Sequence, residues 1–467
     1  MTTKALAEFT AALKYKKLSG HSVEMAKRCM LDWLGIAIRG SQEPPSRIIR
    51  ETVVDTGAQT ATVFSGTGLK ASMLDAAFCN AAASHSLDFD DLHNPSIIHL
   101  ACVVVPPVFA IGEAEHKSGK DMIAAVCAGY EAGGRVGESV IPESYFFWHT
   151  TGTAGTFGAA AAAANLLQLT PEQTVNCYGS AGTQAAGLWE FLKEGAMSKV
   201  LHAGKSAYAG VLSALLSQKG FTGASKILEG EKGFCRAMVK EPHLEKLNEG
   251  LGKGRLKIDD NSFKPYACCK HSHAAIFAVK TLCDEYHIKP EDVDKVKIFV
   301  NEITNYLINN PAPKNPYGCK FSIQYCTSAM LKNGAVGIEE FTPEAIQDVT
   351  VRDLMGRTEV ILDAEMEKIH AEDPAKLASK VALVLKDGRQ VERQVDFPKG
   401  DPDNPLTWDE ARAKFLHLAI PVYGEEKSKK LCELVEHLEK SKDFAEDLAK
   451  CLADRRYYAL NVSLPGI

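Results

Sequence analysis

The sequence predicts a mainly α-helical protein in which both chain ends form one large all-helical domain and the segment between them forms a smaller α+β lid domain. Residues 1–262 carry apolar side chains at helical spacing. Residues 263–402 contain stretches in which apolar and polar side chains alternate, as in strands, and residues 403–467 return to helical spacing. We therefore expect a helical domain from residues 1–262 and 403–467, and an α+β lid from residues 263–402.

Composition narrows the class of protein. With 467 residues, the chain is long enough for about three domains of ~150 residues, or for one large domain with an insertion. A hydrophobic fraction of 45% and a charged fraction of 24% exclude a disordered, collagen-like or membrane-spanning chain. The net charge of -6 gives no basis for binding nucleic acid, so an anionic ligand would need a local positive site.

The helical domain is predicted from apolar spacing and from small residues. Leu6, Phe9 and Leu13 lie on one helix face, and Gly20 ends that pattern. The run Ala159–Ala164 is a strong helix former whose small side chains let neighbouring helices approach closely. We expect this run to lie at the centre of the helical core.

Alternation of apolar and polar residues predicts the strands of the lid. Residues 296–300 form one predicted strand, and residues 381–385 and 391–395 form a predicted hairpin around an Asp387-Gly388 turn. Helices are expected at residues 274–282, 322–331, 343–349, 408–418 and 427–452.

Cysteine usage and the absence of targeting signals indicate a cytoplasmic protein. Most of the 13 cysteines are scattered singly, no CxxC pair occurs, and the adjacent Cys268-Cys269 has no second pair at zinc-site spacing, which is typical of reduced thiols. Residues 1–9 lack the apolar core of a signal peptide. The uncharged stretch Ser144–Pro171 contains His149 and Asn165, so we interpret it as a buried segment and not a membrane span. We expect no membrane partner, no nucleic-acid partner and no metal.

Cofactor motifs are missing from the sequence. Neither GxxxxGK[ST] nor GxSxG occurs, and Gly250–Gly254 lies in a charged stretch instead of a strand-to-helix junction. We therefore expect no nucleotide and no other organic cofactor.

The first polar cluster lies in the segment His85–His93. It contains Asp88 and His93, and His99 follows a few residues later. Carboxylates and imidazoles together suit general acid–base chemistry or a metal site. Adjacent aspartates also cap helices and line solvated turns, so this segment alone does not decide between these uses.

Two further clusters combine histidine with hydroxyl groups or lysine. His149 and Thr150 lie in FFWHTTGTAG, where aromatic neighbours control the ionisation of the imidazole and the glycines let a ligand approach the backbone. Lys199 and His202 are three residues apart and therefore share a helix face. The alternatives without a catalytic role are a hydrogen-bonded core histidine and a solvated lysine.

Two segments of the predicted lid carry the remaining candidates. Lys270 and His273 lie in KPYACCKHSH at a helix start, where free backbone N–H groups and side-chain charge favour a carboxylate. Tyr325 lies in FSIQYC, also at a helix start, where its hydroxyl donates a proton or merely packs. Separated stretches with His, Lys, Asp and Tyr, but without a nucleotide motif, indicate cofactor-independent proton chemistry on a small anion.

Taken in order, these motifs resemble the MmgE/PrpD family, which includes 2-methylcitrate dehydratase, cis-aconitate decarboxylase and iminodisuccinate epimerase. The similar segments run along essentially the whole chain: HSLDFDD, HTTGTAGTFGAAAAAA, MSKVLHAGKSA, KPYACCKHSH, SIQYC and PKGDPDNPLTWDEARAKF. The resemblance implies a large helical domain built from both chain ends, a smaller α+β lid, a homodimer and an active site in the cleft between the domains.

The resemblance to the decarboxylase also implies individual site residues. The catalytic residues are expected at Asp88, His99, His149, Lys199, His273 and Tyr325, and further substrate contacts at His93, Thr150, His202 and Lys270. The sequence departs from that pattern at two places. Leu92 stands where the decarboxylase has Thr, and an extra residue after Asp91 leaves His93 as a competitor of His99. Lys270 stands where many relatives carry Arg, which removes a bidentate carboxylate fork.

The resulting hypothesis is a cofactor-independent lyase for a small di- or tricarboxylic acid, with 2-methylcitrate dehydratase-like loss of water as the preferred reaction. Lysines and His273 would hold carboxylates, His149 or His99 would be the base, Asp88 would orient an imidazole, and Tyr325 would protonate the leaving hydroxyl. Decarboxylation of a cis-aconitate-like substrate and epimerisation of a dicarboxylate such as iminodisuccinate need the same residue types and stay open. A metal-dependent hydratase and a non-catalytic anion-binding protein are more distant alternatives.

Overall fold

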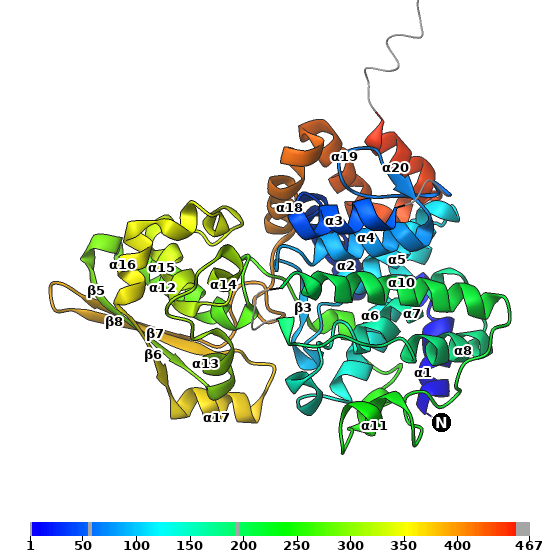
Figure 1. Ribbon diagram of the computed structural model, residues 1–467, viewed down its shortest axis with the longest axis horizontal. Coiled ribbons are helices and arrows are strands. Elements are labelled where there is room, and N and C mark those ends of the chain that lie inside the picture. Colours follow the sequence, from blue (N-terminus) through cyan, green and yellow to red (C-terminus); the bar gives the residue numbers. More distant parts are fainter. Residues whose placement is uncertain (1, 55–57, 192–195, 454–467) are drawn as a thin grey trace, which may run out of the picture.

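The computed structural model describes residues 2–54, 58–191 and 196–453 and confirms the mainly α-helical fold (Figure 1). The helices of the first half are α1 (Thr2–Ala12), α2 (Gly20–Gly40), α3 (Pro44–Val53), α4 (Met73–Ser84), α5 (Ala101–Ala114), α6 (Gly119–Glu138), α7 (Ala154–Leu166), α8 (Pro171–Gly182), α10 (Ser198–Gln218) and α11 (Phe234–Met238). Two short antiparallel pairs accompany them, β1 (Ala61–Thr62) with β2 (Lys70–Ala71) and β3 (Leu92–His93) with β4 (Asn261–Ser262).

Helix α7 lies at the centre of the helical core, as its alanine run predicts. Every residue of this helix is buried. It packs so closely on α6 that a Cβ atom at Gly158 would lie 3.0 Å from the carbonyl oxygen of Gly129. Small side chains at this contact therefore set the spacing of the two helices.

Residues 263–402, the predicted lid, are called the α+β part below. This part contains a four-stranded sheet with strand order β6-β5-β7-β8. Its strands are β5 (Val293–Val300), β6 (Thr358–Leu362), β7 (Ser379–Leu385) and β8 (Gln390–Val395), and its helices are α12 (His273–Tyr286), α13 (Glu302–Ile308), α14 (Pro316–Lys320), α15 (Ile323–Asn333), α16 (Val349–Gly356) and α17 (Ala364–Glu372). Strands β7 and β8 form the predicted antiparallel hairpin, and Gly388 adopts φ 91° in its turn. Helices α12, α15 and α16 lie on one side of the sheet (Figure 1).

The sequence pattern did not predict strand β6, which pairs in parallel with β5 at the edge of the sheet. All five of its residues are half-buried or exposed, so its pattern lacks the buried alternation that identifies an inner strand. The single helix expected over residues 427–452 is also wrong. The chain forms α19 (Glu425–Glu436), a 3₁₀ turn and α20 (Phe444–Leu452), because the Asp443 side chain caps α20 by accepting from the Glu446 N–H.

The C-terminal helices return to the helical part. Helix α18 (Trp408–Tyr423) packs against α2, where a Cβ atom at Gly35 would lie 3.2 Å from the Cα atom of Phe415. In Figure 1, α18, α19 and α20 lie together beside the N-terminal helices α2, α3 and α4. Both chain ends therefore contribute to one helical body.

Buried apolar side chains form two clusters. One draws on residues 6–263 and 406–451, and the other draws mainly on residues 266–395, joined by Ile36, Leu87, Phe89 and Leu418 from the helical part. The two chain crossings between the parts lie side by side, because the Phe263 N–H donates to the Gly400 carbonyl over 2.8 Å. Domain boundaries at residues 263 and 402 stay a prediction.

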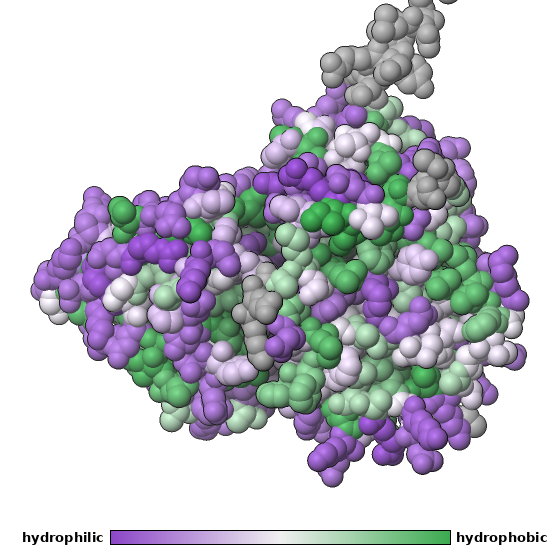
Figure 2. Space-filling model, in the orientation of Figure 1, coloured by the Kyte–Doolittle hydropathy of each residue, from purple (hydrophilic) through white to green (hydrophobic). Residues whose placement is uncertain are grey.

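The surface is mixed in polarity. Hydrophilic side chains cover much of the visible face of the α+β part, with hydrophobic ones between them (Figure 2). No helix in the described ranges is long and apolar enough to cross a membrane. All 13 cysteines are free thiols.

Candidate active site

Asp88 is held in a strained conformation in the loop after α4. Its φ of 54° lies in the left-handed region, which costs a non-glycine residue on the order of 1 kcal/mol. Its Oδ1 atom lies 2.7 Å from the Lys199 ammonium and 3.3 Å from the Lys264 ammonium. Two cations therefore share one carboxylate oxygen, whereas Oδ2 of Asp88 is buried without a hydrogen-bond partner in the described structure.

The Asp88–Lys199 ion pair is almost excluded from water. The two side chains are only 5% and 6% exposed. Burial opposes charge on Asp88, but Lys199, Lys264 and His99 hold its pKa well below its ordinary value. Burial likewise opposes charge on Lys199, and the Asp88 carboxylate nevertheless raises the pKa of this lysine. Both groups are therefore charged at neutral pH.

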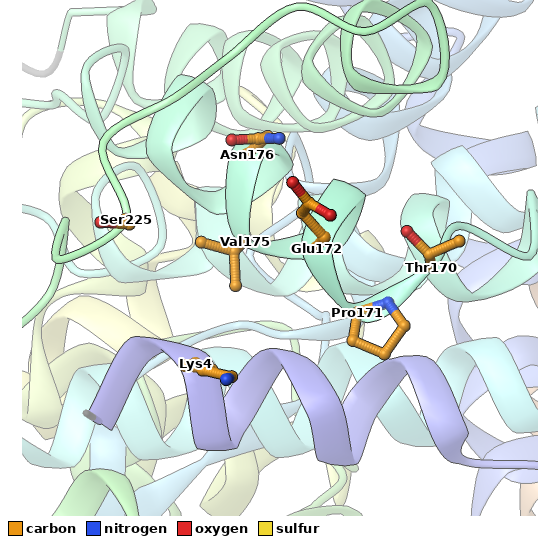
Figure 3. A pocket seen from close by; sticks show the side chains of 7 residues that line it. All are labelled: Lys4, Thr170, Pro171, Glu172, Val175, Asn176 and Ser225. Atoms are coloured by element: carbon orange, nitrogen blue, oxygen red, sulfur yellow. The ribbon is translucent and has the colours of Figure 1, made fainter.

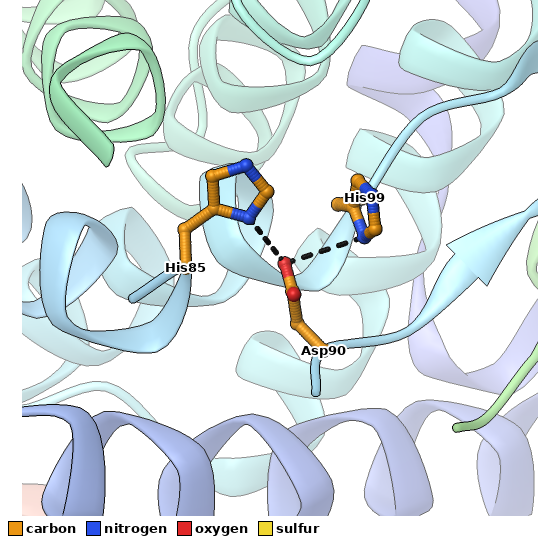
Figure 4. Close-up of side chains that lie close together, drawn as sticks. All are labelled: His85, Asp90 and His99. Carbon is orange, nitrogen blue, oxygen red and sulfur yellow. Dashed lines mark hydrogen bonds and ion pairs between the residues drawn. The ribbon is translucent and has the colours of Figure 1, made fainter. Parts of the chain in front are cut away.

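A second carboxylate, Asp90, lies between two imidazoles (Figure 4). Its Oδ2 atom is 2.6 Å from Nδ1 of His85 and 3.4 Å from Nδ1 of His99. Burial opposes charge on Asp90, but the two histidines lower its pKa strongly, so it is a carboxylate at neutral pH. This geometry orients both rings by their Nδ1 atoms, as carboxylates do in acid–base sites.

The proton of His99 is placed by a backbone contact. Its Nδ1 atom lies 2.6 Å from the Asp91 carbonyl oxygen, which can only accept, so Nδ1 carries the proton and Nε2 keeps its lone pair. Burial lowers the pKa of His99 to about 3, and neighbouring lysines add to this effect. The ring is therefore neutral at pH 7 and offers Nε2 as a base.

Asp91 fixes the backbone that orients His99. Its carboxylate accepts from the Tyr130 hydroxyl at 2.6 Å and from the backbone N–H of Ala101, in the first turn of α5, at 3.0 Å. Burial raises its pKa to about 7. These contacts make Asp91 a cap for α5, which explains why the third aspartate of the motif does not face the imidazoles.

The side chains of His85, Asp90 and His99 also have the composition of a metal site. His85, Asp90 and His99 place ligand atoms within 4.8 Å of one another, and two histidines with one carboxylate are a common donor set. Nδ1 of His99 donates a proton to Asp91, so only its Nε2 lone pair could bind an ion. The hydrogen bonds of Nδ1 on both rings fit proton transfer, with Nε2 of His99 as the exchanging atom.

A second pair of imidazoles adjoins the first. His149 stacks on His85 with ring centroids 5.5 Å apart, and its Nδ1 atom lies 3.1 Å from Nδ1 of His202. Burial lowers the pKa of His149 well below its ordinary value and that of His202 to about 4. Thr150 donates to the Ile97 carbonyl and so fixes the segment that leads to His99.

The structure thus brings together five of the predicted residues: Asp88, His99, His149, Lys199 and His202. It adds His85, Asp90 and Lys264, which lie within the sequence motifs but were not among the predicted site residues. It also separates the two competing histidines. His93 contacts Ser96 at 2.8 Å and lies 4.0 Å from Glu138, so the ring that meets Asp90 is that of His99.

Two residues of the predicted site point elsewhere. The Lys270 ammonium lies 2.5 Å from a carboxylate oxygen of Asp401, so this buried charge is already neutralised within the α+β part. The Tyr325 hydroxyl donates to the Glu340 carbonyl. Both side chains therefore have polar partners within the α+β part, and their roles at the site stay a prediction.

Three side chains of the α+β part lie near the charged groups of the candidate site, namely His273, Phe321 and Tyr317. His273 is buried, its Nε2 atom lies 3.3 Å from the Cys268 carbonyl, and burial lowers its pKa well below the ordinary value. Lys199 lies 5.7 Å from the ring centroid of Phe321, which in turn lies 5.2 Å from the ring of Tyr317. The Tyr317 hydroxyl is buried and lacks a hydrogen-bond partner in the described structure. Tyr317 is therefore a better-placed phenol than Tyr325.

One prominent cavity lies away from this chemistry. A hollow of about 640 Å³ between α1 and α8 is lined by Lys4, Thr170, Pro171, Glu172, Val175, Asn176 and Ser225 (Figure 3). It shares no residue with the imidazole cluster and offers no histidine. We therefore place the candidate site at the cluster and not at this cavity.

The chain is similar to known proteins along most of its length. The chain matches the family model of the MmgE/PrpD N-terminal domain over residues 4–247 and that of the MmgE/PrpD C-terminal domain over residues 266–440. It is 27% identical to a cis-aconitate decarboxylase-like protein of Aspergillus oryzae, with 96% of each chain covered. It is 25% identical to the cis-aconitate decarboxylase of Aspergillus terreus (95% of this chain and 94% of that protein) and 26% identical to the human one (94% and 92%). The chain therefore belongs to the MmgE/PrpD family.

Proposed function

We propose that this protein is a cofactor-independent lyase that decarboxylates a small tricarboxylate of the cis-aconitate type. The observation that carries the proposal is the partly buried His99 ring next to the Asp88–Lys199 pair. Its Nδ1 is held by Asp91 and Asp90, and its Nε2 has no hydrogen-bond partner among the described residues. The likeness to proteins named cis-aconitate decarboxylases over almost the whole chain supports this choice among the family's reactions.

The chemistry of the cluster suits this reaction. When carbon dioxide leaves, the electron pair of the broken C–C bond stays on the substrate and spreads toward a remaining carboxylate. The buried ammonium groups of Lys199 and Lys264 would stabilise that charge. The carbon must then take up a proton. Substrate carboxylates near His99 raise its pKa, so the ring that is neutral without substrate becomes a proton donor when substrate binds.

A second candidate reaction is dehydration of a 2-hydroxy tricarboxylate. Leu92 favours it, because this buried residue of β3 has no hydroxyl where the sequence resemblance to the decarboxylase expects threonine. Dehydration begins with removal of a proton from the carbon next to a carboxylate, for which Nε2 of His99 is suited. Tyr317, with its unpartnered hydroxyl, replaces Tyr325 as the proposed acid for the leaving hydroxide.

The test is a substrate panel followed by NMR. Purified protein is incubated with cis-aconitate, citrate, 2-methylcitrate, malate and iminodisuccinate, and the products distinguish loss of carbon dioxide, loss of water and inversion. We expect cis-aconitate to lose carbon dioxide. Water loss from a citrate-type acid would support the second candidate, and folded protein that changes none of these acids would refute both.

A further inference from the structure

Three consecutive backbone carbonyls around Asp88 each accept a hydrogen bond from a different lysine. The pairs are Lys320 with Leu87, Lys264 with Asp88 at 3.0 Å, and Lys414 with Phe89 at 2.9 Å. We call these three lysines the carbonyl clamp. Their ammonium groups converge on Asp88, the one residue of the His85–Asp91 loop whose φ is positive.

The clamp lysines come from three separate elements. Lys320 ends α14 in the α+β part, Lys264 follows β4 at the crossing between the parts, and Lys414 lies in α18. Lys414 also donates to the Lys264 carbonyl at 2.9 Å and pairs with Asp32 of α2 at 2.7 Å. The loop that carries Asp88 is therefore tied to both parts of the fold.

Side chains reinforce this arrangement. Leu87 and Phe89, which flank Asp88, pack into the apolar cluster of the α+β part. The Lys414 ammonium lies 3.9 Å from the ring centroid of Phe89. Asp88 is thus fastened on both sides, by backbone and by side chain, to elements that follow residue 263 in the chain.

The use of lysine here is costly. A buried ammonium loses its hydration, and a neutral carbonyl compensates for less of that loss than a carboxylate does. Burial lowers the pKa of Lys320 to about 8 and also lowers that of Lys414. No ion pair of Lys320 is found in the described structure, so Leu87 is its principal polar partner.

We propose that Lys320, Lys264 and Lys414 are positioning residues that hold the Asp88 backbone in its left-handed conformation, so that the Asp88–Lys199 pair forms only when the α+β part is docked. The kinetic part of this inference rests on the proposed function, whereas the conformational part does not. Lys320 and Lys414 contact the carbonyls and not the cluster's side chains, so they would act on turnover through the loop.

The test compares Lys320→Met with Lys332→Met. Both variants remove an ammonium from the α+β part, but Lys332 pairs with Asp348 and touches no residue of the loop. For Lys320→Met we expect kcat to fall about 10- to 100-fold, with KM changed about twofold or less, because the catalytic carboxylate is misplaced and the substrate contacts are kept. Lys332→Met should keep both parameters. A folded Lys320→Met protein with wild-type kcat would overturn the inference.

A second measurement works without a substrate. The ring ¹⁵N signals of His85 and His99 report the geometry of the loop, since both rings bind Asp90. We expect both signals to shift in Lys320→Met and to stay in place in Lys332→Met; unchanged signals in Lys320→Met would contradict the clamp. If the panel finds no turnover while these signals shift, the proposed function fails and the clamp stands. Lys414→Met reaches the loop independently through the Phe89 carbonyl, so either folded variant decides the matter.

Discussion

Replacing Lys199 by methionine tests the buried ion pair most severely. Coulomb's law at an effective dielectric constant of about 20 gives on the order of 6 kcal/mol for two charges 2.7 Å apart. Removal of the lysine also removes its own desolvation cost, and breaking a buried pair therefore costs about 3–5 kcal/mol. Lys264 stays 3.3 Å from the same carboxylate oxygen, so we expect the lower end, about 3 kcal/mol.

The assay is chemical denaturation at pH 7, monitored by circular dichroism. The pKa of Asp88 is below its unfolded value of 3.8, so the contribution of this carboxylate is present above that value and is lost as the pH falls through the folded pKa. At pH 7 it is therefore fully present. The Lys199→Met variant should also lose at least about 100-fold in kcat/KM, because the cation that stabilises the developing charge is gone.

Two variants make this prediction refutable. Asp88→Asn added to Lys199→Met should restore part of the lost stability, because no unpaired buried carboxylate is left. Lys332→Met, which breaks a partly exposed ion pair with Asp348, should cost less than about 1 kcal/mol. If Lys199→Met unfolds within about 1 kcal/mol of the wild type, or if the double variant is less stable than the single one, the reasoning about this pair is wrong.

Three further predictions concern pH, metal and the crossing between the two parts. Burial holds the pKa of His93 at about 3 in the folded protein, so below about pH 6.5 the unfolded state binds an extra proton at this residue. This ring alone then contributes a fall in stability of about 1.4 kcal/mol per pH unit. Denaturation between pH 6.5 and 4.5 should show that His93→Gln reduces this slope, and an unchanged slope would contradict the buried neutral ring. Chelation of divalent metals should leave activity unchanged, because the proposed proton transfer needs no metal; loss of activity with recovery on adding one metal would show that His85, Asp90 and His99 bind an ion. Gly400→Ala should destabilise the protein by more than about 2 kcal/mol, because a Cβ atom there would lie 2.2 Å from the Phe263 carbonyl oxygen at φ 97°. Gly388→Ala is its control, with a similar φ of 91° but nothing within 4 Å, and equal midpoints for the two variants would refute the close-contact argument.

The sequence allowed the main architecture to be predicted where local patterns and packing agree. The alanine run of α7 both favours a helix and permits close packing, and the Asp387-Gly388 turn fits the hairpin of β7 and β8. Strand β6 was missed because its residues are not buried in an alternating pattern. Such an edge strand is defined by its partner β5, which a local pattern does not reveal.

The candidate site was also predictable only in part. The sequence motifs identified the segments that carry Asp88, His99 and Lys199, and in the structure these segments lie around one loop. It did not identify the direction of individual side chains in the α+β part. Lys270 and Lys264 lie in the same motif, yet only Lys264 reaches Asp88, and the difference follows from the ion pair that Asp401 forms with Lys270.

The central claim is that this cluster transfers a proton to or from a carbon of a small polycarboxylate without a cofactor. The most direct measurement is NMR of cis-aconitate incubated with the protein in D₂O. We predict a dicarboxylate product one carbon shorter that carries deuterium from the solvent, formed at least about 100-fold more slowly by a folded His99→Gln variant. If folded wild-type protein gives neither product nor deuterium incorporation with cis-aconitate, citrate, 2-methylcitrate, malate or iminodisuccinate, the claim is contradicted.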